Sequence, residues 1–400
     1  MKSKGRIIFT ILVLLCVSTI HAAKPLSNKA QFSFLVGAPN NSSVFSIFGH
    51  ASLRIIDPEL NLDYVFNYGI FDQTQAANIL QLLKGNLFCE LWVYDTEEYL
   101  GKIRQMGIEM KEHLLNLLPE ERETLWQQLI TMGQNQSGRY RYDILRTNCV
   151  TLPLISIEKA ISGKIIYDDS GDWYKGSYSS IGEPYVEKLP WHYFFAYLFF
   201  GSSTNQLLSF RESLFLPYNL EAAFQSAVIE TDTDSRPLLY SSKTLIEGVP
   251  EKITCIFTPL MVGWILFVFI FILSIFEWRK KSYYRIIDCI LYGIAGFFGL
   301  ILFLLNTVFV EWYNWFGYNL LWLHPFHLLG VVFFVRKKFD NPAYYYHCFN
   351  LVALVIGAIA VCNFGILTRQ LTVAAPYMLV LGTRSVFGLM RYYKSKKIIK

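Results

Sequence analysis

Charged residues are scarce in this 400-residue chain. Asp, Glu, Lys and Arg make up 17% of it, whereas 53% is hydrophobic and 16% is aromatic. This composition is too apolar for an ordinary soluble protein and indicates segments that span a membrane. The net charge of +5 is small, and the Lys and Arg residues gather beside apolar runs, which is typical of topology signals. We therefore expect the membrane as a partner and no nucleic-acid partner.

Cysteine is scarce in the polar part of the chain. Of seven cysteines, only Cys89 and Cys149 fall away from the N-terminal segment and the apolar runs. Cys89 lies in an apolar stretch, which predicts a buried, inert thiol more than a disulfide with Cys149. The sequence has no Gly-rich phosphate loop, no convincing carboxylate pair and no repeat array. These absences exclude nucleotide-binding proteins with such a loop, enzymes that use a pair of carboxylates, and solenoid proteins. We also predict no cofactor and no metal.

The N-terminus has the layout of a cleavable secretion signal. Basic residues precede an apolar core from Ile7 to Val17, and the small residues Ala22 and Ala23 follow it. We expect residues 1–23 to be the signal. An uncleaved anchor is the alternative, although the apolar core is shorter than the roughly 20 residues that a span needs.

Five long apolar runs predict membrane helices. They are residues 257–277, 286–310, 318–335, 346–368 and 371–390. Lys and Arg cluster after the first, third and fifth runs, and the other two connections hold almost none, as the positive-inside rule expects. We therefore expect residues 251–400 to be a membrane domain with a cytoplasmic C-terminus, and residues 24–250 to be an extracytoplasmic domain.

A few residues in and beside these runs carry further expectations. His324 and His327 have a helical spacing but no carboxylate or thiol support, so we interpret them as polar packing or the lining of a lipid groove. His324 is a candidate substrate contact, because an ionisable group in a membrane is a functional hypothesis. Arg384 is expected to extend toward the inner surface. The aromatic stretch 190–200 is too short to span, and predicts either an interfacial segment or a buried core helix.

The extracytoplasmic part shows strand and helix patterns. Residues 31–36 predict a strand, and 51–56 with 64–68 predict an antiparallel pair around an Asp57-Pro58 turn. Helical spacing predicts helices over 74–84, 95–105, 119–132 and 151–161. Thr74 and Asp95 are expected to be N-caps.

Cys149 is the most informative residue, because it precedes the predicted helix 151–161. Backbone N–H groups and the helix dipole there favour a thiolate, the reactive form of cysteine. We expect the first N–H groups of this helix to stabilise an oxyanion. The upstream His50 begins a strand and is the natural base. A lone Cys or His is most often structural, but together they predict a nucleophile and its base.

The strand pair adds candidates around His50. Antiparallel pairing brings Asn67 back beside His50, so Asn67 is expected to orient the imidazole, with Tyr68 and Asp63 as weaker alternatives. Arg54 lies on the same strand face as His50 and can hold a phosphate or, as we prefer, pair with an acidic neighbour. The candidate substrate contacts are Arg54, Tyr68, Asn148 and His324.

A strand His followed by Asn-Cys at a helix start resembles the circularly permuted papain-like group, which includes NlpC/P60-like and lecithin:retinol acyltransferase-like enzymes. More closely, four motifs resemble Lnb, a family of bacterial lipoprotein N-acyltransferases. They are Phe48–Arg54, Asp63–Asp72, Asn148–Thr151, and Phe215–Pro217 with Leu220. His50 and Cys149 match the catalytic positions of that family, and Asn67 matches a pattern position.

The resemblance implies an α+β permuted papain-like periplasmic domain, followed by an all-α domain of five transmembrane helices in a bacterial inner membrane. It implies transfer of a fatty acyl chain from a membrane phospholipid to the α-amino group of a diacylated lipoprotein. We expect a Cys149 thioester as the intermediate. Two alternatives stay open: a membrane-tethered papain-like cysteine peptidase or amidase acting on the cell wall, and a non-catalytic membrane scaffold.

Overall fold

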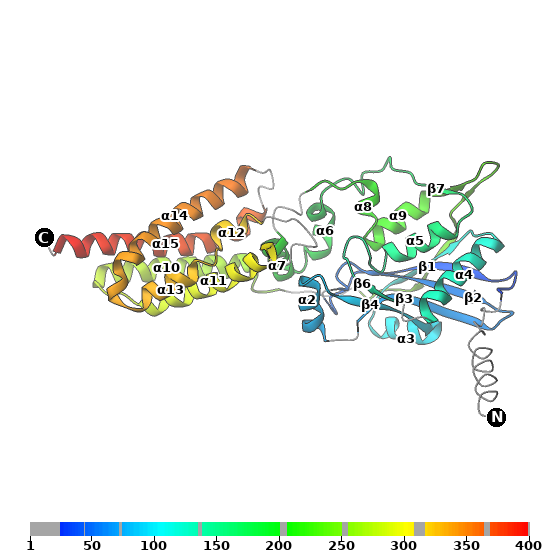
Figure 1. Ribbon diagram of the computed structural model, residues 1–400, viewed down its shortest axis with the longest axis horizontal. Coiled ribbons are helices and arrows are strands. Elements are labelled where there is room, and N and C mark those ends of the chain that lie inside the picture. Colours follow the sequence, from blue (N-terminus) through cyan, green and yellow to red (C-terminus); the bar gives the residue numbers. More distant parts are fainter. Residues whose placement is uncertain are drawn as a thin grey trace, which may run out of the picture.

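The structure is a computed structural model in which two bodies, a sheet-containing domain and an elongated helical bundle, lie end to end (Figure 1). Helices α6 (Tyr178–Val186) and α7 (Pro190–Phe200) lie between the two bodies. The residues that the structure describes are 25–43, 45–71, 74–134, 138–200, 206–249, 255–307, 317–363 and 369–398. The expected secretion signal lies outside them.

A seven-stranded sheet forms the centre of the first domain, in the order β10-β5-β1-β2-β3-β4-β6, and its neighbouring strands are antiparallel. These strands are β1 (Gln31–Gly37), β2 (His50–Asp57), β3 (Leu62–Ile70), β4 (Phe88–Asp95), β5 (Met110–Leu115), β6 (Arg139–Arg141) and β10 (Leu239–Ile246). A small second sheet contains β7 (Lys164–Ile166), β8 (Val228–Glu230) and β9 (Ser235–Pro237).

Helices cover both faces of the large sheet. Those that pack against it are α3 (Thr96–Gln105), α4 (Pro119–Gln134), α5 (Thr151–Ala160) and α9 (Pro217–Ser226). The same domain contains the shorter helices α2 (Gln75–Leu83) and α8 (Phe210–Ser213). Phe34 of β1 packs in the larger core, where its ring centroid lies 5.1 Å from that of Phe224 on α9. The next residue, Leu35, packs in a smaller core with Tyr99 of α3. Burial on both faces explains why β1 is almost continuously apolar.

The elements expected around the catalytic candidates are confirmed to within two residues at each end. β1, β2, β3, α2, α3, α4 and α5 all form where the sequence patterns place them. Thr74 accepts a hydrogen bond from the backbone N–H of Ala77, and Asp95 accepts from those of Glu97 and Glu98, so both are N-caps. Cys89 is buried in β4 and forms no disulfide with Cys149, as expected.

Four described helices of the second body are long and apolar enough to cross a membrane. They are α10 (Pro259–Lys280), α11 (Arg285–Thr307), α14 (Asp340–Asn363) and α15 (Arg369–Ile398). α15 packs against α10 and α14. Four of the five apolar runs therefore form long helices.

The third apolar run is broken, contrary to a continuous helix over 318–335. It forms α12 (Asn319–Trp322) and α13 (His327–Val335), with non-helical backbone between them. Pro325 lies in the gap. In a continuous helix it would lack the backbone N–H needed there, and its ring would clash with the carbonyl four residues earlier. The sequence pattern predicted an apolar segment of this length, but it did not predict the break in the helix.

The aromatic stretch 190–200 forms α7, which packs against the bundle. Phe194, Tyr197 and Leu198 are buried in one core cluster with residues of α11, α14 and α15. The indole N–H of Trp191 donates to the carbonyl of Phe257 at 2.9 Å, just before α10. Of the two readings of this segment, the buried helix is the one that the packing supports.

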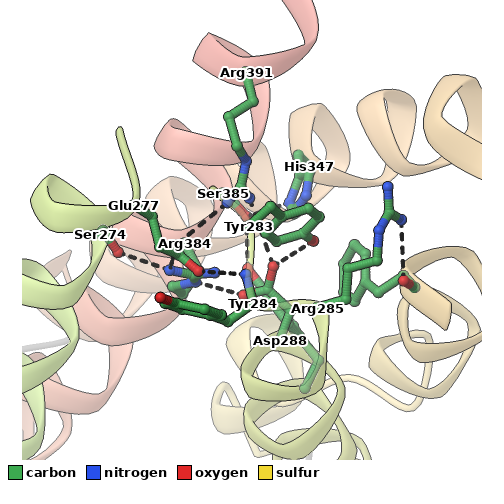
Figure 2. A network of polar contacts seen from close by, with 12 residues as sticks. Ser274, Glu277, Tyr283, Tyr284, Arg285, Asp288, His347, Arg384, Ser385 and Arg391 are labelled. Carbon is green, nitrogen blue, oxygen red and sulfur yellow. Dashed lines mark hydrogen bonds and ion pairs between the residues drawn. The ribbon is translucent and has the colours of Figure 1, made fainter. Parts of the chain in front are cut away.

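A charge cluster holds the far end of the bundle together (Figure 2). Arg384 of α15 is fully buried and donates to Asp288 of α11 at 2.5 Å, to Glu277 of α10 at 2.6 Å and to Ser274 at 2.9 Å. Arg391 lies 3.4 Å from Glu277. The expectation that Arg384 extends to the inner surface is therefore wrong, because two buried carboxylates hold its guanidinium inside the bundle.

Replacing Arg384 by Met should destabilise the bundle by about 3–5 kcal/mol, because Glu277 and Asp288 would stay buried with a large part of their charge uncompensated. Arg279→Met, at an exposed position of α10, is the control and should change stability by about 0.5 kcal/mol or less. Denaturant unfolding of the purified protein in detergent measures both. Equal stability of the two variants would contradict a clamping role for Arg384.

Candidate active site

The β2–β3 hairpin places His50 beside Asn67. The strands pair in a register that sets Leu53 opposite Phe66, so the last residues of β3 return alongside the first residue of β2. The turn contains Asn61 with φ 54°, a left-handed conformation that Asn tolerates better than most residues. His50 Nε2 and Asn67 Oδ1 are 2.5 Å apart, so the predicted contact is present.

The Cys149 thiol completes this group. Its sulfur is hydrogen-bonded to the His50 side chain and also accepts a hydrogen bond from the backbone N–H of Ala51. With Nε2 donating to Asn67, the Nδ1 nitrogen is left to accept the thiol proton. The three residues that the sequence singled out for catalysis are therefore brought together, from two strands and the loop before α5.

Glycines allow the backbone to approach this closely. Gly49 has φ +86°, and a Cβ there would lie 2.8 Å from the carbonyl oxygen of Gly37. Gly69 has φ +83°, and a Cβ there would lie 3.8 Å from Cys149 Cβ. Both positions need a left-handed conformation that other residues rarely adopt. The residue before the base and the residue beside the thiol are thus fixed as glycine for steric reasons.

The loop that carries Cys149 is held by the preceding Asn148. Its Oδ1 accepts from the backbone N–H groups of Val150 and Thr151, both at 2.8 Å. Its Nδ2 donates to the carbonyls of Ile144 and Phe215, at 2.7 and 3.0 Å. Asn148 is 4% exposed, and the N–H donors and the oxygen of its amide all form hydrogen bonds within the protein. We therefore assign Asn148 a structural role at the start of α5.

These bonds correct the expectation about the oxyanion. The N–H groups of Val150 and Thr151 already donate to the Asn148 side chain, so the first helical N–H groups are not open to a substrate. The N–H groups that lie at the sulfur are those of Cys149 itself and of Ala51. Sequence reasoning missed Ala51, because only the three-dimensional approach of β2 to the thiol reveals its N–H.

The electrostatics favour a charged thiol–imidazole pair. Burial alone would raise the pKa of Cys149, but the nearby imidazolium, its hydrogen bond and the two backbone N–H groups outweigh burial and lower the pKa below 9.0. Burial likewise opposes the charged form of His50, yet the thiolate and the Asn67 bond raise its pKa above 6.5. The thiolate and the imidazolium therefore stabilise one another.

The remaining candidates have other contacts. Arg54 donates to Asp63 at 2.7 and 2.8 Å and to Glu112 at 3.0 Å, which is the acidic pairing we preferred, and Asp63 is thereby occupied away from His50. Tyr68 is fully buried in the larger core, where we assign it a packing role. His324 lies in the helical bundle, apart from the catalytic group.

Tyr140 of β6 is a neighbour that the sequence did not reveal. Its hydroxyl oxygen lies 3.9 Å from the position of a Cβ on Gly69, the same position that faces Cys149. Burial raises its pKa above the usual value for tyrosine, and the nearby Cys89 and Cys149 raise it further. β6 has only three residues, too few for a strand pattern to be recognised.

Apolar side chains surround the catalytic group. One cluster contains Leu87, Cys89 and Tyr142 with Phe45 and Phe71 packed against it. A second contains Leu208, Phe215 and Leu216 with partly buried neighbours that include Phe48 and Tyr185. Within the described residues, no group of three or more His, Cys, Asp or Glu side chains is placed to hold a metal ion.

Comparisons with known proteins agree on one family. Residues 27–176, which contain His50, Asn67 and Cys149, match the family model described as the Lnb N-terminal periplasmic domain. Residues 251–396 match the model described as the Lnb transmembrane domain. No curated protein and no solved structure matches the chain. The first body thus corresponds to a periplasmic domain and the second to a membrane domain.

The lowered pKa of Cys149 predicts how fast iodoacetamide alkylates it at each pH. The rate should rise through a midpoint below 9.0, because the thiolate persists to lower pH than an ordinary thiol. In His50→Gln the midpoint should move upward, since burial then acts without the imidazolium. Asn67→Ala should give a smaller upward shift, because only one of the bonds that favour imidazolium is lost.

Mass spectrometry of the Cys149 peptide gives the rate, and Cys149→Ala gives the background from other cysteines. Identical midpoints in the native protein and His50→Gln would show that the imidazole does not activate the thiol.

Proposed function

Because the chain belongs to the Lnb family, we propose that it is a lipoprotein N-acyltransferase. It moves a fatty acyl chain from a membrane phospholipid to the α-amino group of a diacylglyceryl-cysteine lipoprotein. The observation that carries the proposal is the hydrogen-bonded set of Cys149, His50 and Asn67. A thiol nucleophile, a base and an orienting amide are the parts that acyl transfer through a covalent intermediate requires.

The first half-reaction breaks the donor ester. The Cys149 thiolate attacks the ester carbonyl of the phospholipid, and the C–O bond to glycerol breaks as the tetrahedral intermediate collapses. The imidazolium of His50 gives its proton to the leaving glycerol oxygen. A lysophospholipid departs, and the acyl chain remains as a thioester on Cys149.

The second half-reaction forms the amide. The lipoprotein amine attacks the thioester carbonyl, and His50, now neutral, accepts a proton from the nitrogen. The C–S bond breaks and returns the thiolate. The hydrogen bond to Asn67 keeps the proton on Nε2 throughout. Nδ1 therefore donates the proton in the first half-reaction and accepts it in the second.

The backbone N–H of Cys149 is the donor best placed to stabilise the oxyanion of each tetrahedral intermediate. It belongs to the nucleophile and already lies at the sulfur. The corresponding groups of Val150 and Thr151 are taken by Asn148. A preorganised donor of this kind typically contributes about 2.7–4 kcal/mol to the barrier reduction.

The membrane domain crosses the inner membrane five times in this proposal. The broken third segment counts as a crossing, because Arg285 at the start of α11 donates both to Phe334 near the end of α13 and to Asp340 at the start of α14. α12 and α13 together therefore return the chain to the end where α11 begins. With Lys and Arg concentrated at that end, the C-terminus is cytoplasmic and the catalytic domain is periplasmic.

Membrane attachment suits the two substrates. The donor ester and the acyl chains of the acceptor both reside in the bilayer, and a catalytic domain fixed to the bundle meets them at its surface. A cell-wall peptidase would also use a thiol and an imidazole, but its product would be a free acid, and a scaffold would need neither side chain.

Mass spectrometry of lipoprotein N-termini tests the transfer directly. Cells with the native protein should carry three acyl chains on the N-terminal cysteine, whereas cells with Cys149→Ala should carry two. His50→Ala should lower the rate by about 10²–10⁴-fold, since proton transfer in both half-reactions is lost. Cys89→Ala is the control, and acylation should persist in it.

Acylation that is unchanged in Cys149→Ala would remove the proposed function. With purified protein, phospholipid and a diacylated lipopeptide, release of free fatty acid without an acylated amine would identify a hydrolase instead.

A further inference from the structure

The gap between α12 and α13 places non-helical backbone inside the membrane domain. It comprises Leu323, His324, Pro325 and Phe326. Irregular backbone at membrane depth is tolerated where it is buried in protein or lines a cavity, and broken helices recur at substrate sites of membrane proteins. The gap thus differs from the rest of a bundle whose other described membrane segments are long helices.

His324 in this gap has unused hydrogen-bonding groups. The residue is 5% exposed, and neither ring nitrogen has a hydrogen-bond partner on another described residue. Its neighbour His327 is fully bonded, with Nδ1 2.6 Å from the Tyr346 hydroxyl and Nε2 2.9 Å from the carbonyl of Trp322. The third histidine of the described bundle, His347, contacts Ser385. Buried polar side chains in proteins are nearly always hydrogen-bonded, and an unpaired one in a membrane segment indicates a functional site.

The gap lies in the half of the bundle that faces the catalytic domain. A Cβ on Gly299 of α11 would lie 2.6 Å from the backbone carbonyl carbon of His324, so the gap packs directly on α11. Gly299 lies about 12 Å along the helix from Thr307, the last described residue of α11. In the proposed topology, with a hydrocarbon core about 30 Å thick, the gap lies in the outer half of that core and deeper than the ester groups of the leaflet. A lipid ester therefore reaches the gap only when the lipid enters the membrane domain.

α7 joins the same region. Asn319 of α12 donates to the carbonyls of Tyr197 and Leu198 on α7, both at 3.1 Å. Phe298, next to Gly299, has its ring centroid 6.2 Å from that of Phe195 on α7. The gap is therefore connected by direct contacts to the helix that links the catalytic domain to the bundle.

The cover over His324 consists of side chains that face outward. The ring centroids of Phe326 and Phe349 lie 6.1 and 5.1 Å from that of His324. Phe326 is 54% exposed and Phe349 is 46% exposed on the surface of the bundle. Both rings therefore lie against the imidazole and also reach the outer surface of the bundle.

We propose that His324 binds the ester group of a glycerolipid substrate that enters the membrane domain between Phe326 and Phe349. A neutral imidazole offers one N–H donor and one acceptor nitrogen, which suit an ester carbonyl and a glycerol hydroxyl or water beside it. The inference rests on the proposed function, since both the phospholipid donor and the diacylglyceryl group of the acceptor carry such esters. His324 is a binding residue here and takes no part in the bond changes at Cys149.

Photolabelling of the full-length Cys149→Ala protein in lipid nanodiscs tests this site. One arm uses a diacyl phospholipid with a diazirine beside its ester carbonyl, and the other uses a diacylglyceryl-cysteine lipopeptide with the same group. Mass spectrometry should find adducts concentrated on Leu323–Phe326 and on Phe349. Labelling by one probe identifies the donor or the acceptor site, and labelling by both identifies a shared site.

Three variants separate binding from structure. His324→Leu should lower the labelling of these peptides at least about fivefold, and His324→Gln, which keeps a donor and an acceptor, should restore much of it. Phe297→Leu, at an exposed position of α11, should leave labelling unchanged. His324→Leu should lower the thermal unfolding temperature little, because no hydrogen bond to another described residue is lost, whereas His327→Leu loses two and should lower it more.

Labelling spread evenly over the outer surface of the bundle, or labelling unaffected by His324→Leu, would overturn the inference. So would a loss of thermal stability in His324→Leu as large as that in His327→Leu. Because Cys149→Ala performs no chemistry, labelling is independent of acyl transfer. Failure of the proposed function would instead appear as labelling of this site in a protein whose native Cys149 transfers no acyl chain.

Discussion

The hydrogen bond between Cys149 and His50 is the interaction on which the proposed chemistry depends. The two residues lie on elements far apart in the sequence, so the contact exists only if β2, β3 and the start of α5 are all placed correctly. The hairpin register sets Asn67 against His50, and Asn148 ties the Cys149 loop to its surroundings on two sides. An imidazolium and two backbone N–H groups face the sulfur and lower the pKa of Cys149 despite its burial.

The same chain segment that presents the base also contacts the linker to the membrane. Phe48, two residues before His50, has its ring centroid 5.5 Å from that of Tyr185 on α6. α6 leads within a few residues into α7, whose Phe194 packs 5.3 Å from Tyr377 of α15. Continuous packing therefore runs from the active site to the bundle. Such packing holds the thiol at one position relative to the bundle, which matters for the proposed reaction because both of its substrates reside in the bilayer.

Local patterns predicted much of the fold and the catalytic group. β1, β2, β3 and α5 follow from alternation and capping signals, and the pairing of β2 with β3 was enough to place Asn67 beside His50. What failed depends on tertiary contacts. The N–H of Ala51 and the hydroxyl of Tyr140 approach the thiol only after the sheet has formed. Arg384 was expected to extend toward the inner surface, because its two carboxylate partners lie on other helices and no local pattern reveals them.

The polar groups of the bundle divide by how well their neighbours satisfy them. Toward one end, the positive charge of Arg384 is matched by Asp288 and Glu277, although its Nη2 atom has no hydrogen-bond partner among the described residues. In the other half, His324 is buried among aromatic rings, and its nitrogens have no partner on another described residue. Burying an unpaired polar group costs free energy, and retaining one beside the linker to a catalytic domain is reasonable where a substrate supplies the missing bonds. The exposed aromatic rings beside His324 and the donor and acceptor of its imidazole together favour a lipid ester as that substrate.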